Sequence, residues 1–321
     1  MMLISYKEKL YNVDFVRDRT EGFENFIKEI ERQDVDELAK IAGVDKQLVK
    51  EAAIAYATAK NSMEFHGLGV TEHEQGSKTV MLIADLAMIT GNIGRKGVGV
   101  NPLRGQNNVQ GAADMGCQPH QGAGYFNVAD EKNQKFYSEK YGVTHPTKPG
   151  LKIPEMFEAA INKELKAVWI IGEDIVQTDP NSSHVIEAME SLEFLVVQEI
   201  FMSETAKLAT VVLPGTTFLE KDGTFTNTER RIQRVNRAVP PLPGTKTDAV
   251  IVTQMMQKLG FNQPNYDADE VLKEIADIVP FFKGVTRERL GKFGLQWPVQ
   301  EDGTDTKILH TQTFKFGKGR L

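Results

Sequence analysis

The stretch Ala167-Val-Trp-Ile-Ile-Gly-Glu-Asp174 decides the fold. Its apolar first part is typical of a buried strand, and the glycine and the two acidic residues that follow are typical of a strand end. Segments with the same two kinds of pattern flank it: helices expected over 153–165 and 181–192, and strands expected over 194–197 and 210–213. Because strands alternate with helices, the sequence predicts a parallel, doubly wound α/β sheet.

Ligands of such sheets bind beyond the carboxyl ends of the strands. Two groups of polar and glycine residues follow the first two expected strands: Gly172, Glu173, Asp174 and Thr178 after the first, and Gln198 after the second. We therefore expect these residues at one edge of the sheet, where a nucleotide could bind.

A second strand–turn–helix unit lies nearer the N-terminus. Met63–Val70 is predicted to form a short strand that breaks into a Gly-x-Gly turn, and a helix is expected from about Gln75 to Thr90. This arrangement can place backbone N–H groups around an anion. A single Gly-x-Gly is also common in plain turns, so the pattern alone leaves both interpretations open.

Residues 91–124 are rich in glycine and also carry Arg104, Gln106, Asn107, Asn108 and Gly111. Glycine allows the backbone to approach a ligand closely, and the amide and guanidinium groups supply hydrogen-bond donors. The alternative is a flexible linker, although linkers usually favour serine, proline and charged residues. The segment is best suited to an extended anionic cofactor.

Composition excludes several classes of function. The chain has 321 residues and a net charge of −6, which argues against bulk binding of nucleic acid. It has one cysteine, Cys117, expected to be a small packed residue, and six histidines that form no ligand-like pair. No metal ligand is therefore predicted. A Walker P-loop and a GxGxxG fingerprint are both absent, so an ordinary nicotinamide enzyme is not favoured.

No targeting segment or membrane span is recognisable. We expect a soluble chain without direct membrane insertion, and the sequence leaves a cytoplasmic or a periplasmic location open.

At the start of the last third of the chain, Glu220–Val235 is predicted to form a hairpin with an Asp222-Gly223 turn. Its arginines could form a solvated loop, or bind phosphate or a carboxylate-bearing domain.

The run Arg104-Gly-Gln-Asn-Asn-Val-Gln-Gly111 resembles a segment of formate dehydrogenase catalytic subunits, which belong to the molybdenum or tungsten enzymes that carry bis-molybdopterin guanine dinucleotide. Further blocks resemble the family in its own order and cover nearly the whole chain: residues 20–24, 66–73, 86–94, 172–174, 197–201, 213–214 and 220–231. The 104–111 block resembles the formate dehydrogenase branch, and the other blocks are shared more widely.

The resemblance implies two Rossmann-like α/β domains, residues 1–106 and 107–218, each bordering one pterin-guanine dinucleotide, and an incomplete smaller α+β segment, 219–321. Arg104 would hold the carboxylate of formate beside the metal, because a planar, always charged fork suits a carboxylate. The active-site floor would include Gln106, Asn107, Asn108 and Gly111. One dinucleotide would be bordered by Gly67, Leu68, Gly69 and Glu72, and the other by Gly172, Glu173, Asp174, Thr178 and Gln198, with carboxylates accepting from guanine N–H groups.

The same resemblance implies formate as substrate, carbon dioxide as product and two electrons that leave through a 4Fe–4S cluster toward an iron–sulfur subunit. The family's metal-ligating cysteine or selenocysteine and its cluster cysteines precede the block matched by Tyr11–Glu24, and a β-rich domain follows the match to Leu321. The chain therefore resembles the central portion of such a subunit and is expected to bind no cluster and to be inactive alone. Two alternatives remain: another molybdopterin oxidoreductase, such as a nitrate reductase-like enzyme, or a cofactor-free structural subunit of a respiratory complex.

Overall fold

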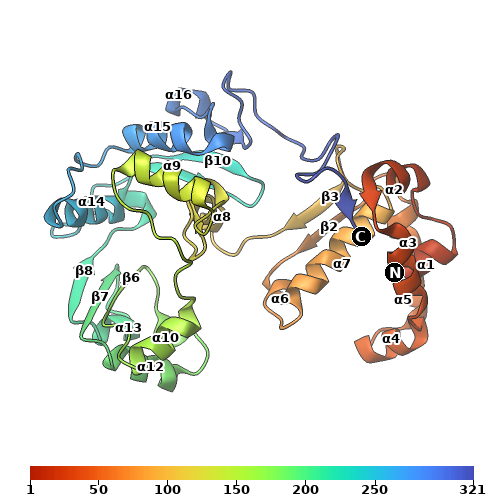
Figure 1. Ribbon diagram of the computed structural model, residues 1–321, viewed down its shortest axis with the longest axis horizontal. Coiled ribbons are helices and arrows are strands. Elements are labelled where there is room, and N and C mark those ends of the chain that lie inside the picture. The colour runs from red at the N-terminus through yellow and green to blue at the C-terminus, as the bar shows by residue number, and fades with distance from the viewer. The chain divides into compact units, whose positions relative to one another are not determined.

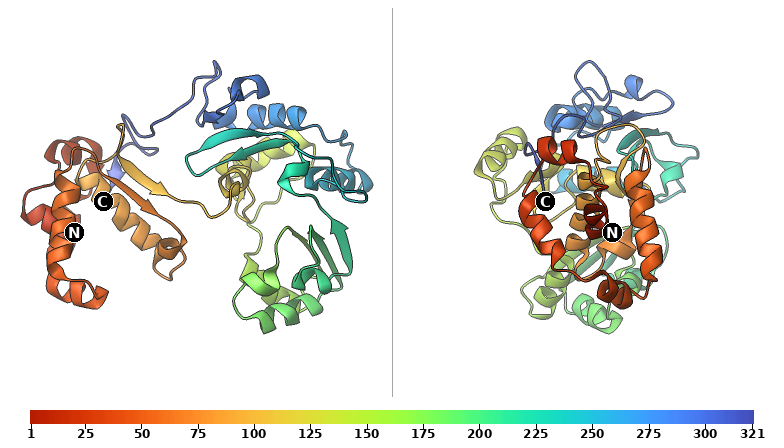
Figure 2. Two further views of the ribbon diagram at one scale, coloured as in Figure 1. Left: turned by 180° about the vertical axis from the view of Figure 1, so that it is seen from behind. Right: turned by 90° about the vertical axis from the view of Figure 1, so that its right-hand side faces the viewer.

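The computed structural model describes residues 1–321. The chain divides into two compact units, which we describe separately: unit 1 contains residues 1–107 and 306–321, and unit 2 contains residues 108–305. Figure 1 follows the chain through both units, and Figure 2 gives two further views.

Unit 1 is mostly helical and contains two small parallel sheets. Its helices are α1 (Met2–Lys7), α2 (Val13–Arg19), α3 (Phe23–Glu31), α4 (Val35–Ala42), α5 (Lys46–Thr58), α6 (Leu68–Thr71) and α7 (Gly76–Ile89). Its strands are β1 (Thr20–Glu21), β2 (Met63–His66), β3 (Gly99–Pro102) and β12 (Gly319–Arg320). The side chains of Asp34 and Asp45 accept hydrogen bonds from the first turns of α4 and α5, so these acidic residues act as N-caps.

The C-terminal segment returns to the start of the chain in unit 1. Strand β12 pairs in parallel with β1, and Leu321 packs against the buried residues Val16, Leu86 and Ile89. Gly22 lies at this contact with φ +88°, and a Cβ atom there would stand 2.8 Å from the carbonyl oxygen of Leu321. Glycine is therefore required at this position for both conformational and steric reasons.

Strands β2 and β3 pair in parallel, with Met63 opposite Gly99 and His66 opposite Pro102. Helices α6 and α7 form the connection between them, as a parallel pair needs a long crossover. The short strand predicted at the start of Met63–Val70 is confirmed: it ends at His66, directly before Gly67, and the turn that follows is the helical turn Leu68–Thr71. The predicted Gln75–Thr90 helix is confirmed as α7.

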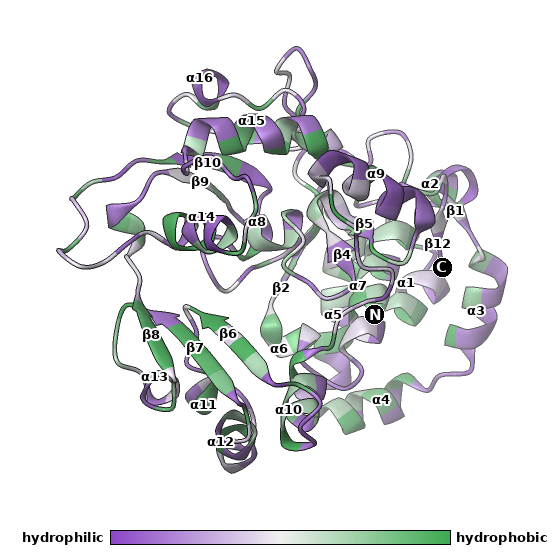
Figure 3. Ribbon diagram, turned by 60° about the vertical axis from the view of Figure 1, so that its left-hand side comes forward, coloured by the Kyte–Doolittle hydropathy of each residue, from purple (hydrophilic) through white to green (hydrophobic).

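Unit 2 contains the three-stranded parallel sheet β6-β7-β8 that the opening stretch predicts. Its strands are β6 (Ala167–Ile171), β7 (Phe194–Glu199) and β8 (Val211–Pro214), and its helices are α10 (Ile153–Ile161), α11 (Ile175–Thr178), α12 (Ser182–Glu190) and α13 (Glu204–Lys207). Buried residues of these helices form one cluster with Ile170, Leu195 and Val197. Strand residues alternate between faces, so these helices pack on the face that carries those three side chains. Figure 3 shows the apolar character of the strands.

The rest of unit 2 is a mixed layer around an antiparallel sheet of order β11-β10-β9. Its elements are α8 (Val109–Asp114), β4 (Gln121–Gly122), η1 (Ala123–Tyr125), β5 (Phe126–Asn127), α9 (Glu131–Tyr141), η2 (Phe218–Glu220), β9 (Gly223–Thr226), β10 (Arg231–Val235), α14 (Asp248–Lys258), α15 (Ala268–Ile278), η3 (Pro280–Phe282), α16 (Arg287–Leu290) and β11 (Leu295–Gln296). Ile232, Leu272, Phe282 and Val285 lie in its buried cluster. Figures 1 and 2 show α9 and α15 beside this sheet.

The α/β class with mainly parallel strand pairing is confirmed, and two local predictions are wrong. The predicted hairpin exists as β9–β10, but Asn227–Arg230 form its turn, and Gly223 is already the first residue of β9. The register explains this shift, since Gly223 pairs with Val235 at the open end of the hairpin. Cys117, expected to be packed, is exposed. The three-part division 1–106, 107–218 and 219–321 stays a prediction.

No helix in the structure combines the length and the apolar character that crossing a membrane requires.

The sheet cluster generates a first prediction. Leu195 is 2 % exposed, so Leu195→Ala removes buried methyl groups and leaves a cavity. We expect a loss of about 2–5 kcal/mol in the free energy of unfolding, measured by chemical denaturation. The control Leu259→Ala changes a side chain that is 70 % exposed, and its effect should stay within about 0.5 kcal/mol. Equal effects of the two substitutions would contradict the assigned core.

Candidate functional site

The carboxyl edge of β6-β7-β8 brings together the residues that the sequence places there. Ile171 pairs with Gln198, which pairs with Leu213, so the three strands end in register. The backbone N–H of Gly172 donates a 2.9 Å hydrogen bond to the carbonyl oxygen of Gln198. Gly172 has φ +66°, a left-handed conformation that turns the chain away from the sheet directly after β6.

Asp174 anchors the loop that follows β6. One of its carboxylate oxygens accepts hydrogen bonds from the backbone N–H and the hydroxyl of Thr205, at 2.9 and 2.7 Å. The other oxygen accepts from the side-chain amide of Gln177 at 2.7 Å. Burial acts to raise the pKa of Asp174, but these donors outweigh it, and the pKa lies below its ordinary value. Asp174 is therefore a charged link between β6 and α13.

Glu173 and Thr178 face solvent at the same edge. The carboxylate of Glu173 makes no hydrogen bond or ion pair within the chain, unlike its neighbour Asp174. An unpaired, exposed carboxylate is an acceptor available to a ligand with N–H or O–H groups.

Gln198, the next-to-last residue of β7, is 1 % exposed and lies on the face of the sheet opposite α10–α13. Its side-chain amide donates a 2.8 Å hydrogen bond to Oδ1 of Asp248, the first residue of α14. The ammonium of Lys221 lies 2.5 Å from Oδ2 of the same carboxylate. Oε1 of Gln198 is buried and has no hydrogen-bond donor within the chain. Such an acceptor costs about 1–3 kcal/mol when nothing pairs with it, which favours a donor from outside the chain.

Asn108 and Gly111 lie at the start of α8 and join this helix to the hairpin. Oδ1 of Asn108 accepts a 2.9 Å hydrogen bond from the backbone N–H of Thr226 in β9. A Cβ atom on residue 111 would stand 2.3 Å from that same oxygen, so the link requires glycine there. Both residues therefore have a structural reason to be what they are, beside any contact with a cofactor.

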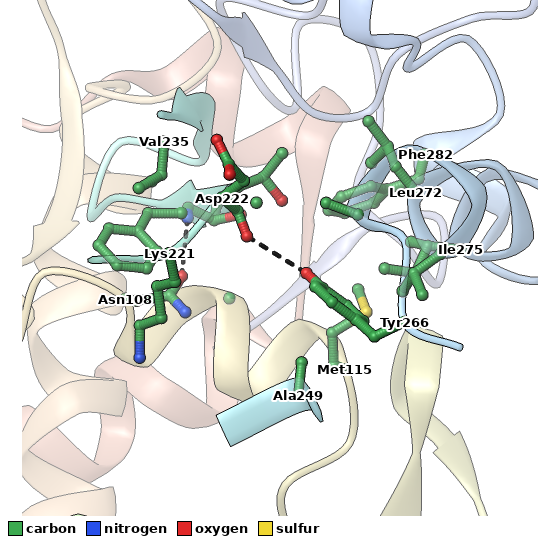
Figure 4. A pocket seen from close by; sticks show the side chains of 17 residues that line it. Asn108, Met115, Lys221, Asp222, Val235, Ala249, Tyr266, Leu272, Ile275 and Phe282 are labelled. Atoms are coloured by element: carbon green, nitrogen blue, oxygen red, sulfur yellow. Dashed lines mark hydrogen bonds between the residues drawn. The ribbon is translucent and has the colours of Figure 1, made fainter. Parts of the chain in front are cut away.

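A cavity of about 280 Å³ opens beside this link (Figure 4). Its wall is apolar on the side of α15, where Leu272 and Ile275 lie, and polar where Lys221 and Asp222 lie. The hydroxyl of Tyr266 donates a 3.2 Å hydrogen bond to the carbonyl oxygen of Asp222 across it. Because Lys221 lines the cavity and also pairs with Asp248, the α8 region and the end of β7 are connected within unit 2.

The other predicted site residues lie in unit 1, at the carboxyl ends of β2 and β3. The N–H of Leu103 donates a 2.7 Å hydrogen bond to the carbonyl oxygen of His66, so both strands end together. Gly67, Leu68, Gly69 and Glu72 form or flank α6, and Arg104, Gln106 and Asn107 follow β3. A Cβ atom on Gly105 would lie 3.8 Å from a methyl group of Leu68, which places the two segments side by side. Arg104 and Gln106 are exposed.

Half-buried carboxylates lie on the elements that support this part of unit 1. Burial raises the pKa of Glu64 on β2, and raises that of Asp85 on α7 to about 6. Nδ1 of His66, which is 7 % exposed, is buried without a hydrogen-bond partner.

Sequence reasoning missed Asp248, Lys221 and Thr205. Asp248 carries only the weak signal of an acidic residue in the first turn of a helix, α14. That signal cannot reveal its contact with Gln198, which is 50 positions away in the chain. Thr205 lies in the short helix α13, and only the fold brings its hydroxyl to Asp174.

Asp174 generates a prediction about acid stability. Because its pKa is lower in the folded chain than in the unfolded one, its ionised form stabilises the fold above the unfolded pKa, near 3.8. This contribution is lost as the pH falls through the lower folded value. Asp174→Asn should therefore lower the denaturation midpoint at pH 7. It should also lose less stability than the unchanged protein when the pH is lowered below about 4. The control is Glu173→Gln, which is expected to leave the denaturation midpoint unchanged both at pH 7 and below about pH 4. An unchanged midpoint at pH 7 in Asp174→Asn would disprove the anchoring role.

Comparison with known proteins supports a family assignment. The sequence profile of the family described as molybdopterin oxidoreductase matches residues 7–258. The F420-dependent formate dehydrogenase subunit alpha of Methanocaldococcus jannaschii is 43 % identical over 323 aligned residues, covering 100 % of this chain and 48 % of that protein. Formate dehydrogenase H of Escherichia coli is 40 % identical, covering 92 % of this chain and 42 % of its own length.

The chain thus spans about half the length of the curated relatives it matches. Among solved structures, the acetylene hydratase of Pelobacter acetylenicus matches 89 % of this chain and 42 % of its own with a TM-score of 0.67. That likeness is one of fold, since sequence identity is 18 %. The matched profile covers most of both units, and the related sequences cover the whole chain: the chain belongs to the molybdopterin oxidoreductase family.

Proposed function

We propose that this protein is a formate dehydrogenase catalytic subunit, which oxidises formate to carbon dioxide at a molybdenum or tungsten ion held by bis-molybdopterin guanine dinucleotide. The observation that carries the proposal is the identity of 40–43 % to named formate dehydrogenases along nearly the whole chain. The family itself supports a molybdopterin cofactor with molybdenum or tungsten. The guanine dinucleotide form, the substrate and the route of the electrons are parts of the proposal.

The edge of β6-β7-β8 suits one guanine dinucleotide. The guanine base presents adjacent N–H donors, and this edge offers the free carboxylate of Glu173 and the unpaired Oε1 of Gln198 as acceptors. Gly172 leaves the approach open, because nothing lies within 4 Å of the position where its Cβ would be. Asp174 keeps the loop in place through Thr205. The residues present therefore fit the base of the proposed cofactor.

We assign the second dinucleotide to Gly67, Leu68, Gly69 and Glu72 in unit 1. Open space surrounds the Cβ position of Gly69, so a ligand can approach the backbone there. Glu72 is exposed and supplies a carboxylate acceptor. Gln106, Asn107, Asn108 and Gly111 are proposed to line the cofactor and the floor of the active site, although Asn108 also holds the hairpin.

Arg104 is the proposed catalytic residue for formate. Its guanidinium is always charged and presents a planar fork of donors, which can hold a carboxylate in one orientation and stabilise charge as the C–H bond breaks. The bound metal and its pterins supply the two-electron chemistry. Gln106 is proposed to assist by donating from its side-chain amide.

We also propose that the electrons pass through a 4Fe–4S cluster of the longer protein toward an iron–sulfur subunit. The chain described in this structure would bind neither the cluster nor the metal by side chains of its own, and would be inactive alone. The proposal leaves both compartments, cytoplasm and periplasm, open.

Formate-dependent dye reduction tests the assignment. The 321-residue chain and a version extended to the length of its relatives would be expressed with molybdate and selenite. We expect dye reduction by the extended protein alone, because the resemblance places the metal ligand and the cluster cysteines outside this chain.

Activity in the short chain would contradict the proposed position of the metal ligand and would direct attention to the exposed Cys117. Bound cofactor without activity in either form would favour an enzyme with another substrate. Absence of both molybdenum and pterin would favour a structural subunit. Metal and pterin content would therefore be measured in the same samples.

Arg104 generates a second prediction in the extended protein. Arg104→Lys keeps the charge and removes the fork, so kcat/KM for formate should fall by about 100-fold. Arg32→Lys is the matched control, because Arg32 is exposed and pairs with Glu29 on the surface. Its kcat/KM should match that of the unchanged protein. Equal values for Arg104→Lys and the control would remove Arg104 from the proposed site.

A further inference from the structure

Three groups form a hydrogen-bonded network near the end of β7: the side-chain amide of Gln198, which is buried, and the carboxylate of Asp248 and the ammonium of Lys221, which are partly buried. Neither Asp248 nor Lys221 belongs to the residues assigned to the cofactor above. The side chains of Lys221 and Asp248 are 29 % and 34 % exposed, so their pair is partly shielded from solvent.

The order of donors and acceptors among these three groups fixes the orientation of the side-chain amide of Gln198. An ionised carboxylate can only accept hydrogen bonds, and Oδ2 of Asp248 already accepts one from the ammonium of Lys221. Gln198 must therefore offer its NH₂ group to Asp248. Its oxygen then points away from the carboxylate and has no donor within the chain, although the residue is 99 % buried.

Two neighbouring hydroxyl groups, those of Thr216 and Thr247, are also buried without partners. Gly215 lies between Gln198 and Asp248, because a Cβ there would approach both side chains within 4 Å. A hydroxyl group can donate or accept, so the threonines do not select a type of ligand atom. The orientation of Gln198 does select one.

We propose that Asp248, held by Lys221, is a positioning residue that makes Gln198 an acceptor toward the ligand bound at the end of β7, and thereby selects a base that donates N–H. The inference rests on the proposed cofactor site, and it assigns the preference for guanine to a residue that does not touch the base. Guanine carries a donor N–H at position 1, whereas adenine carries an acceptor nitrogen there, so the two bases test the orientation directly.

The decisive variant is Asp248→Asn. Lys221 can still donate to the carbonyl oxygen of the new amide, which turns the new NH₂ group toward Gln198. Gln198 would then rotate to accept that hydrogen bond and would present its own NH₂ group to the ligand. The NH₂ group of Gln198 would then face the N–H donor of guanine, which is unfavourable. It could instead donate to the acceptor nitrogen of adenine.

The matched control is Lys221→Met. It breaks the ion pair completely but leaves the carboxylate of Asp248 in place, so Gln198 keeps its orientation. A structural contribution of the ion pair would make this variant at least as damaging as Asp248→Asn, whereas the proposed orientation effect spares it. Asp277→Asn is a surface control, since Asp277 is an exposed aspartate that pairs with Lys140.

The experiment measures the binding of guanosine and adenosine monophosphates to the cofactor-free, full-length protein by equilibrium dialysis. We expect the unchanged protein, Lys221→Met and Asp277→Asn to prefer the guanosine nucleotide by about tenfold, the effect of one unpaired buried acceptor. Asp248→Asn should bind both nucleotides about equally. Thermal denaturation checks that each variant is folded. If Asp248→Asn does not fold, Gln198→Met, which removes the acceptor, should show the same loss of preference.

Retention of the preference in Asp248→Asn overturns the inference, and so does its loss in Lys221→Met. Absence of any preference in the unchanged protein, or of nucleotide binding, also overturns it. None of these outcomes decides the proposed function, which is judged separately by metal and pterin content and by dye reduction.

Discussion

Parallel strands joined by helical crossovers must all end at the same edge of their sheet, and the organisation of unit 2 depends on this constraint. It brings Gly172 and Gln198, 26 positions apart by their numbers, into direct hydrogen-bond contact. It also explains why polar residues that interrupt separate apolar runs form one surface. The same rule applies on a smaller scale in unit 1, where β2 and β3 end together beside α6.

The edge is held by charge-assisted hydrogen bonds as well as by the backbone. Asp174 links the end of β6 to α13, and Asp248 links the end of β7 to α14. Hydrogen bonds to a charged group are stronger than neutral ones. Two nearby acceptors differ from these: Oε1 of Gln198 is buried without a partner, and the carboxylate of Glu173 is exposed to solvent. The contrast between paired and unpaired acceptors is the physical basis for placing a ligand here.

Several residues serve both the fold and the proposed site. Oδ1 of Asn108 accepts a hydrogen bond from the backbone N–H of Thr226, and a side chain at position 111 would clash with that same oxygen. Lys221 lines the cavity of unit 2 and holds Asp248. A substitution of Asn108 or Gly111 is therefore expected to change stability as well as the proposed contacts with the cofactor.

The amino-acid sequence by itself determined the α/β class, the helix α7, the three strands of the parallel sheet and the edge that carries Gly172, Asp174 and Gln198. It did so because strand and helix periodicities and glycine-rich turns are local properties, and because parallel strands share an edge. The family resemblance added roles for Arg104 and for the 104–111 block. Only the tertiary structure decided the turn of the hairpin, which depends on strand register, and the exposure of Cys117. It alone revealed the contacts of Asp248 with Gln198 and of Thr205 with Asp174, since pairs so far apart in the chain leave no local pattern.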